Sequence, residues 1–477
     1  MRPRLWLRKP APDRELLRAR RRDRAPAGKR EFASSCTGNL RELTGRNRRL
    51  GQMDQAEHKI FTKIAWRLIP FILLLYLINY IDRVNIGFAG LTMNQDLGLS
   101  PSVFGFAAGI FFFSYSVFQI PGNIIMQRIG ARRWVFSILI VWGLISASTA
   151  FVTGPYSLYT LRFLLGVAES GFFPGMLLYL TFWFPQAYLG RFIGMFMTGI
   201  PLAFIIGGPT SSLILQMDGV LGFHGWQWLF IIEGLPAAFL SLAVLKLMPD
   251  GPAQAEWLTA EEKRIVTARL ASETHVAESH NIWAGLLNIR IIAVGMVLAG
   301  IQFGLYGVQL WIPQIVQSMG YSTLATGFLV AIPFIAGGIG MVLWARKSDR
   351  SGERIWHIAI PCLFGAGGLL FGSMMQNDFL VILGLTCGLI GILSIEGPLF
   401  SLPKLMLSGA AAASGIALVN SLGSLGRLFG PIVMGELRES TGGYSSGLAA
   451  LAVGLIFSAG LVLILGRVMA HRAVKYT

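Results

Sequence analysis

The chain has 477 residues, of which 54% are hydrophobic and 13% are charged, and its formal net charge is +16. Soluble proteins carry roughly 25% charged residues, so this composition argues against a soluble enzyme and indicates a membrane protein. The charge does not indicate a nucleic-acid partner, because most of it lies in one segment. Residues 1–52 hold 16 of the 40 Lys and Arg and 5 of the 24 Asp and Glu, which is a net charge of +11. The rest of the chain therefore has a net charge of +5.

Residues 1–58 are polar and Arg-rich and contain no apolar run, so they are not a secretory signal peptide. We interpret them as a basic, disordered N-terminal extension with three open origins. The first is an arm that touches anionic lipid headgroups. The second is an organellar transit sequence, against which the acidic residues of the segment argue. The third is a true translation start at Met53, and we favour this start or an arm without function.

Apolar runs of about 20 residues, the length that spans a bilayer, recur twelve times from Ile64 onward. They predict an all-α membrane protein whose twelve transmembrane helices contact the lipid bilayer. The predicted spans are 64–89, 102–126, 134–152, 156–183, 191–215, 226–248, 289–316, 322–345, 355–376, 378–402, 410–435 and 445–467.

Lys and Arg collect in alternate loops, after the even-numbered spans. The other loops contain almost none, and Arg438 is the one found. Because cytoplasmic loops retain positive charge, this pattern places both the N- and the C-terminus in the cytoplasm.

The longest interruption, residues 249–288, divides the twelve spans into six and six. It contains the segment Thr259-Ala260-Glu261-Glu262, which has the spacing of a capping box and predicts a short linker helix to about Ser272. The predicted parts are an N-terminal extension (1–58), a first six-helix bundle (59–248), a linker (249–288), a second six-helix bundle (289–470) and a C-terminal tail (471–477).

A repeated turn supports two pseudo-symmetric halves. Both copies place an Arg two residues before a Gly, with basic residues nearby, at the same point of each half. Two related six-helix bundles around a site in the middle of the membrane are typical of alternating-access transporters. The candidate conformational residues of the two turns are Arg128, Gly130 and Arg132, then Asp349, Arg350 and Gly352.

These turns resemble the loop motif of the major facilitator superfamily, Gly-x-x-x-Asp-Arg-x-Gly-Arg-Lys. Asn123 and Gln127 replace the Gly and the Asp of the first copy, which weakens the charge relay expected there. Four other segments resemble the anion:cation symporter branch, most of all its bacterial tartrate-type, organic-acid and sugar-acid permeases: Tyr80–Gly87, Ile120–Asn123, Leu161–Gly175 and Gly225–Pro236.

The resemblance covers the chain from Met53 and implies the major facilitator fold. It further implies a monomer in the bacterial inner membrane. The expected partners are a small organic anion, which is a tartrate-like dicarboxylate or a sugar acid, and the H⁺ taken up with it.

Asp82 and Arg83 lie in the first predicted span, and Arg162 and Glu169 lie in the fourth. Charged residues at membrane depth are costly and mark functional sites. Arg162 and Glu169 are seven residues apart, two helical turns, so they share one face. Because Arg stays charged, a carboxylate substrate can replace a protein carboxylate as its partner.

By the resemblance, Asp82 and Glu169 are the protonation sites and Arg83 is the main anchor of the substrate. Protonation of Glu169 would free Arg83 or Arg162 to bind the anion. The alternative is a structural ion-pair network that holds the first and fourth helices together.

Further candidates come from the resemblance and from departures from it. Phe400 stands where relatives have an aromatic residue, usually Trp, that faces the cavity, with core packing as the alternative. Glu396 and Arg427 lie where relatives tend to be uncharged. The helical rise puts them in opposite halves of the membrane, so direct pairing is not expected, and Arg427 is a candidate second contact for a dianion. Three residues match positions that hydrogen-bond substrate in sugar-acid relatives, with packing as the alternative: Tyr80, Tyr115 and Asn420.

No cofactor, metal site or enzyme activity is predicted, because the histidines lack metal-ligand spacing and no GxxxxGK[ST] loop is present. Two rival functions remain, an exporter of drugs or metabolites from the same superfamily and a nontransporting sensor on the same scaffold. The segment Gly207-Gly208-Pro209 lacks the fuller glycine pattern of antiporters, which counts against export. The charged residues of the first and fourth spans count against a sensor.

Overall fold

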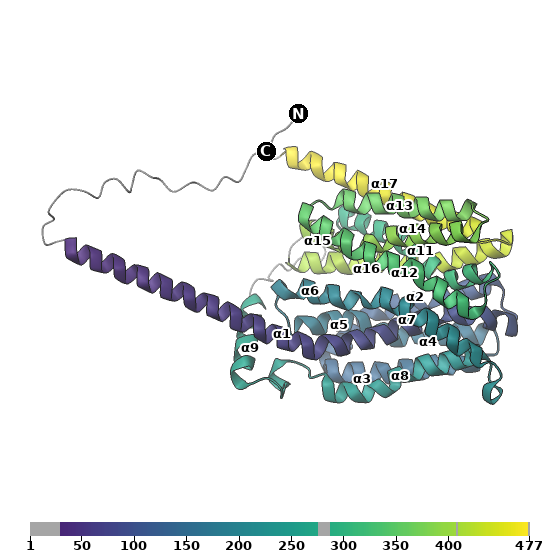
Figure 1. Cartoon of the computed structure of the whole chain (residues 1–477), viewed down its shortest axis with the longest axis horizontal. Coiled ribbons are helices and arrows are strands. Elements are labelled where there is room, and N and C mark those ends of the chain that lie inside the picture. Colours follow the sequence, from purple (N-terminus) through teal and green to yellow (C-terminus); the bar gives the residue numbers. More distant parts are fainter. Residues whose placement is uncertain (1–28, 275–286, 407–408, 476–477) are drawn as a thin grey trace. The chain divides into compact units, whose positions relative to one another are not determined.

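The computed structural model describes residues 29–274, 287–406 and 409–475, and the elements it forms there are all helical. The chain divides into two units, residues 1–60 and 61–477. The first contains the beginning of helix α1 (Lys29–Asp96), and the second contains everything discussed below. In the second unit long helices run side by side as a bundle (Figure 1).

The prediction of twelve transmembrane helices is confirmed, because twelve helical spans among the described residues are long and apolar enough to cross a membrane. Two spans of the N-terminal half and one of the C-terminal half consist of two consecutive helices. The N-terminal half continues from α1 with α2 (Pro101–Ile129), α3 (Ala131–Ser148), α4 (Pro155–Glu169), α5 (Phe172–Thr181), α6 (Gln186–Met197), α7 (Gly199–Ile214) and α8 (Gly225–Leu247). The C-terminal half comprises α11 (Ile289–Gln317), α12 (Thr323–Ser351), α13 (Ile355–Met374), α14 (Asp378–Ser394), α15 (Glu396–Met406), α16 (Gly409–Thr441) and α17 (Ser445–Lys475).

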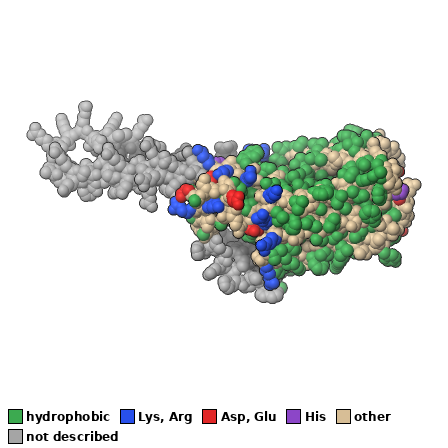
Figure 2. Space-filling model, turned by 90° about the horizontal axis from the view of Figure 1, so that it is seen from below, with side chains coloured by type: hydrophobic (Ala, Val, Ile, Leu, Met, Phe, Trp, Pro, Cys, Tyr) green, Lys and Arg blue, Asp and Glu red, His purple; other side chains and the backbone are tan. Residues whose placement is uncertain are grey.

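The surface of the bundle is apolar along its flank. Large side chains such as Phe113, Phe239 and Ile464 are more than half or about half exposed there. Figure 2 shows this flank as continuous hydrophobic surface, with Lys and Arg gathered near one end. Helices satisfy their own backbone hydrogen bonds, so apolar side chains can face lipid without leaving polar backbone groups unpaired.

The two ends of the bundle differ. We call the end that carries linker residues 249–274 and the α2–α3 and α12–α13 turns the linker end. The end with the α1–α2 turn is the opposite end. In the linker, helix α9 (Ala260–Thr274) begins with the expected capping box. The backbone N–H of Thr259 donates to Glu262 Oε2 (2.8 Å) and the backbone N–H of Glu262 donates to Thr259 Oγ1 (3.2 Å).

The halves contact each other through α2 with α16 and α7 with α12. The hydrogen bonds that join the halves lie in the middle of the bundle and at the opposite end. At that end Ser100 Oγ donates to Glu439 Oε2 (2.8 Å), and Asn94 Nδ2 donates to Gln314 Oε1 (3.2 Å).

Candidate functional site

Arg83 and Glu169 form a buried ion pair between α1 and the end of α4. Arg83 Nη2 lies 2.9 Å from Glu169 Oε2, and side-chain exposure is 6% for Arg83 and 0% for Glu169. Asn79, one turn before Arg83 on α1, donates from Nδ2 to the same Oε2 (2.8 Å) and accepts from Arg83 Nη2 at Oδ1 (3.3 Å). The other carboxylate oxygen of Glu169, Oε1, is buried without a protein partner.

The fourth span is interrupted directly after Glu169. Helix α4 ends at Glu169, and α5 begins at Phe172. Gly171 at the break packs against Trp134, and a Cβ at Gly171 would lie 2.6 Å from an indole carbon. The small residue at this position therefore lets α3 approach the break, and the break leaves the Glu169 carboxylate at a helix end.

Aromatic rings surround the Arg83 guanidinium. Its Cζ lies 4.9 Å from the ring centroid of Tyr115, 5.5 Å from that of Phe111 and 5.6 Å from that of Tyr80. The face of an aromatic ring attracts a cation, and more strongly away from water. The rings therefore stabilise the guanidinium without occupying its N–H donors.

Arg162 lies near this cluster in a different environment. Its Cζ is 4.9 Å from the Phe111 centroid, its side chain is fully buried, and its guanidinium nitrogens have no hydrogen-bond partner in the protein. Glu169 and Asp82 are the acidic groups that act on it electrostatically. Of the two arginines that the sequence offered as partners of Glu169, the structure places Arg83 in the ion pair.

Asp82 points away from the ion pair, toward α3. Its carboxylate accepts hydrogen bonds from the Trp142 indole N–H and the Ser146 hydroxyl of α3, and from Asn85 Nδ2 (3.0 Å). Consecutive helical residues point about 100° apart, so Asp82 and Arg83 reach different neighbours although they are adjacent in the chain. Sequence reasoning missed Trp142 and Ser146, because nothing in the sequence tells which helix Asp82 faces.

The C-terminal half reaches the cluster through Tyr306 and Gln309 of α11. The Tyr80 hydroxyl lies 3.5 Å from the Tyr306 hydroxyl and donates to Gln309 Oε1 (3.3 Å). These residues and Gln302 are buried. They were missed, although residues 302, 306 and 309 have helical spacing and form one polar stripe in an apolar helix.

Glu396 begins α15, directly after a break in the tenth span at Ile395. Glu396 is 8% exposed, and the groups that act on its carboxylate are Arg427 of α16 and Gln302. Arg427 Cζ lies 5.8 Å from the Tyr306 centroid. The structure records an electrostatic influence of Arg427 on Glu396 but no ion pair between them, so direct pairing, which the sequence did not predict, is not seen.

The last two candidates are not joined to the cluster by hydrogen bonds. Asn420 Nδ2 donates to the carbonyl oxygen of Ile416 (3.2 Å), one turn earlier in its own helix. Phe400 is half-buried in α15.

The first repeated turn contains an unpredicted carboxylate. The backbone N–H of Arg132 donates to Asp250 Oδ1 (2.8 Å), and Gly130 adopts a φ of +88°. A Cβ at Gly130 would lie 2.9 Å from the same oxygen. Asp250, which follows α8, thus supplies an acidic group at the turn where Gln127 replaces the expected Asp, while Arg128 is exposed.

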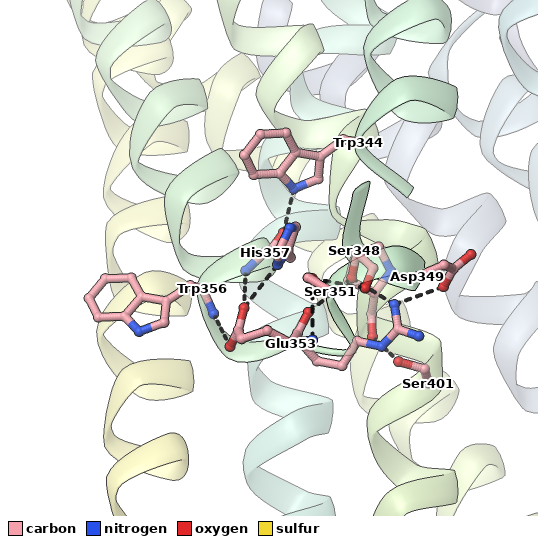
Figure 3. Close-up of polar contacts among 10 residues, drawn as sticks. Trp344, Ser348, Asp349, Ser351, Glu353, Trp356, His357 and Ser401 are labelled. Carbon is pink, nitrogen blue, oxygen red and sulfur yellow. Dashed lines mark hydrogen bonds and ion pairs between the residues drawn. The ribbon is translucent and has the colours of Figure 1, made fainter. Parts of the chain in front are cut away.

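In the second turn the predicted Asp349 forms an ion pair with Arg354 (2.9 Å). Arg354 also donates to Ser348 Oγ (2.6 Å), and Gly352 ends α12 with a φ of +68°. Figure 3 shows Ser348 and Asp349 beside the α12–α13 turn, where the Trp344 indole N–H donates to the His357 carbonyl oxygen (2.8 Å). Arg350 is exposed and lines a cavity of about 570 Å³ with Arg346 and Lys347.

Twelve candidate membrane-spanning helices among the described residues, with buried charged residues on the first and fourth spans, are typical of a multi-pass membrane transporter. Residues 72–431 match the family model of the Major Facilitator Superfamily, and the chain belongs to this superfamily.

Relatives agree with this family. A "Putative tartrate transporter" of Agrobacterium vitis is 46% identical over 413 residues, which are 86% of this chain and 92% of the relative. A "Quinolone resistance transporter" of Acinetobacter baumannii is 38% identical over 411 residues, 85% of this chain and 94% of the relative. The crystal structure of an inward-facing, occupied bacterial homolog of the human lysosomal transporter Spinster superposes with a TM-score of 0.69 at 14% identity, over 84% of this chain and 96% of that chain, which supports the fold alone.

Proposed function

We propose that the protein takes up a small organic anion, a tartrate-like dicarboxylate or a sugar acid, together with H⁺ by alternating access. The observation that carries this proposal is the buried Arg83–Glu169 pair at the break of the fourth span (2.9 Å). A guanidinium held by a carboxylate can exchange it for the carboxylate of a substrate. The tartrate-transporter relative supports the substrate class.

In this mechanism Glu169 and the substrate compete for Arg83. A proton on the partnerless Oε1 neutralises Glu169, weakens its attraction for Arg83 and leaves the guanidinium free to bind the anion. Release of the proton restores the ion pair and displaces the anion. Asp82, which is held by Trp142 and Ser146, is the second proposed protonation site.

The contacts between the halves are consistent with one state of such a cycle. Hydrogen bonds between the halves lie in the middle and at the opposite end, which supports a cycle in which the linker end opens while the opposite end is closed. The Lys and Arg pattern assigns the linker end to the cytoplasm, and we infer a bacterial inner-membrane location with both termini cytoplasmic.

The quinolone-resistance relative is the specific observation that favours the alternative, an exporter. An exporter driven by the same gradient exchanges H⁺ for substrate, whereas a symporter moves both in one direction. The direction of the proton gradient that drives accumulation therefore separates the two functions.

The test is uptake into proteoliposomes of a panel of carboxylates under an inward proton gradient. We expect gradient-driven accumulation by the wild type, and loss of accumulation with retained substrate exchange in Glu169→Gln. Glu261→Gln is the control, because Glu261 lies on the linker helix and pairs with Arg264 (2.7 Å). Full accumulation by Glu169→Gln would exclude Glu169 as the proton carrier, and accumulation only under an outward gradient would favour the exporter.

A further inference from the structure

The C-terminal half contains an acidic and a basic residue, Glu396 and Arg427, at a helix break that corresponds to the break beside Glu169. Helix α4 ends at Glu169, and its counterpart in the six-plus-six repeat, the tenth span, is interrupted so that α15 begins at Glu396. Each break therefore carries a buried Glu. Glu169 forms an ion pair with Arg83, and Glu396 is influenced electrostatically by Arg427. In transporters, broken helices near the middle of the membrane form binding sites for substrates and ions.

Each of the two arginines lies near one member of a tyrosine pair that joins the halves. Arg83 Cζ is 5.6 Å from the Tyr80 centroid, and Arg427 Cζ is 5.8 Å from the Tyr306 centroid. The hydroxyls of Tyr80 and Tyr306 are 3.5 Å apart. Tyr115 is within electrostatic reach of both guanidiniums. One guanidinium from each half thus faces the same polar region between the halves.

Arg427 retains unused hydrogen-bonding capacity. Its Nε is buried without a protein partner. Among the described residues, the groups that act electrostatically on the neighbouring Glu396 are Arg427 from α16, Gln302 from α11 and Tyr76 from α1, and Arg427 is the cation of this set. A guanidinium presents a planar fork of donors that fits a carboxylate, and partial burial strengthens the attraction.

We propose that Arg427 binds a second carboxylate of the substrate, so that the protein selects dicarboxylates by contributing one arginine from each half. This assignment rests on the proposed function, with Arg83 as the anchor of the first carboxylate. Glu396 is a positioning residue that holds Arg427 while the site is empty. A substrate that bridges the two halves also links their movement, because both of its charged ends must be released before the halves separate.

The alternative is that Glu396 and Arg427 only hold α15 against α16. Stability alone cannot separate the two possibilities, because both predict that removal of Arg427 disturbs packing. Selectivity between two ligands that differ by one charge does separate them, because a structural pair affects both ligands alike.

The test compares binding of tartrate and its half-amide, tartramate, to the purified full-length protein by calorimetry. We expect the wild type to bind tartrate at least about tenfold more tightly than tartramate, the effect of one charge-assisted contact. Arg427→Gln should weaken tartrate binding to the affinity of tartramate and leave tartramate binding nearly unchanged. Glu396→Gln should retain the preference for tartrate.

Arg438→Gln is the matched control, because Arg438 also lies on α16 and stacks on a tyrosine, Tyr444 (4.4 Å), but at the opposite end. This variant should leave the ratio of the tartrate affinity to the tartramate affinity unchanged. If Arg427→Gln does not give a folded, monodisperse protein, Arg427→Lys is the second variant. Lys keeps the positive charge but lacks the planar guanidinium donors, so the preference for tartrate over tartramate should still decrease.

The assignment would be overturned if the folded Arg427 variant kept the wild-type ratio of tartrate to tartramate affinity. An equal loss of affinity for both ligands would also overturn it. Binding of monocarboxylates without any preference for dicarboxylates by the wild type would overturn it and leave the proposed function intact. Binding of no carboxylate would overturn both.

Discussion

Arg83 and Arg162 show how two buried arginines beside one phenylalanine take different roles. Arg83 is neutralised by Glu169, whereas Arg162 has no hydrogen-bond partner in the protein. A buried charge without close partners contributes nothing to stability compared with an apolar residue of similar size. Packing therefore does not account for Arg162, and we infer that it is retained for its charge, which influences Glu169 and Asp82.

Arg162→Met tests this inference. Because Met fills a similar volume without charge, we expect the thermal unfolding midpoint to stay the same or rise, while proton-driven uptake is lost. Glu169→Gln under the same conditions provides the comparison for lost coupling. A fall in the midpoint by several degrees together with normal uptake would show that Arg162 is structural.

Arg83→Lys tests the anchor. A lysine keeps the charge but replaces the planar guanidinium, which can donate two parallel hydrogen bonds to a carboxylate, by a single ammonium group. Substrate affinity should therefore fall at least about tenfold. Arg133→Lys, at an exposed position after α2, is the control. The measurement is equilibrium binding of the substrate found in the uptake panel, and wild-type affinity in Arg83→Lys would remove Arg83 from the site.

At the scale of elements, the linker helix α9 is attached to the N-terminal half. Lys63 of α1 forms an ion pair with Glu262 (2.8 Å), and the backbone N–H of Gln186 donates to Glu273 Oε2 (2.9 Å). Trp257 of the linker stacks on Trp183 with ring centroids 5.7 Å apart. These contacts attach the linker helix to the N-terminal half.

Attachment of α9 should depend on pH. The hydrogen bond from Lys63, with further help from the Thr259 backbone N–H, holds the pKa of Glu262 below its ordinary value of 4.5. The stabilisation is therefore present above about pH 4.5 and is lost as the pH falls through the lower folded-state pKa.

Amide hydrogen exchange of α9 measures this effect. Because the pair is partly exposed and contributes roughly 0.5 kcal/mol, we expect about a twofold loss of protection at acid pH after correction for the intrinsic rate. Glu262→Gln should show the lower protection at every pH. Glu261→Gln should behave as the wild type, and equal pH dependence in all three proteins would contradict the assignment.

At the scale of the whole molecule, the closure of the opposite end depends on glycines where the halves meet. A Cβ at Gly105 of α2 would lie 2.6 Å from the Pro431 carbonyl oxygen of α16. Gly208 of α7 approaches the Gly327 carbonyl oxygen of α12 in the same way, with 2.6 Å from the constructed Cβ. Larger side chains at these positions would separate the halves at this end.

Gly105→Leu should therefore prevent closure of the opposite end. We expect uptake to fall more than about tenfold, because alternating access requires both closed states, while the protein stays folded and still binds substrate. Gly367→Leu is the matched control, since a Cβ at Gly367 meets no atom within 4 Å. Normal uptake by Gly105→Leu would show that the halves do not need this contact.

The sequence by itself determined the class of fold and the identity of the main charged residues. Apolar length identifies membrane spans because a bilayer imposes about 20 residues on each helix, and the twelve spans are present. The cost of burying charge singled out Asp82, Arg83, Arg162 and Glu169, which are all buried.

Only the tertiary structure decided which of these residues meet. It pairs Glu169 with Arg83, turns Asp82 toward α3, places a helix break beside Glu396 and adds Tyr306 of α11 to the cluster. The physical reason is that apolar periodicity fixes the length of a membrane helix but not its rotation, its breaks or its neighbours. Those depend on how the side chains of different helices pack, and the contacts between them join residues far apart in the chain, such as Tyr80 and Gln309, which are 229 positions apart.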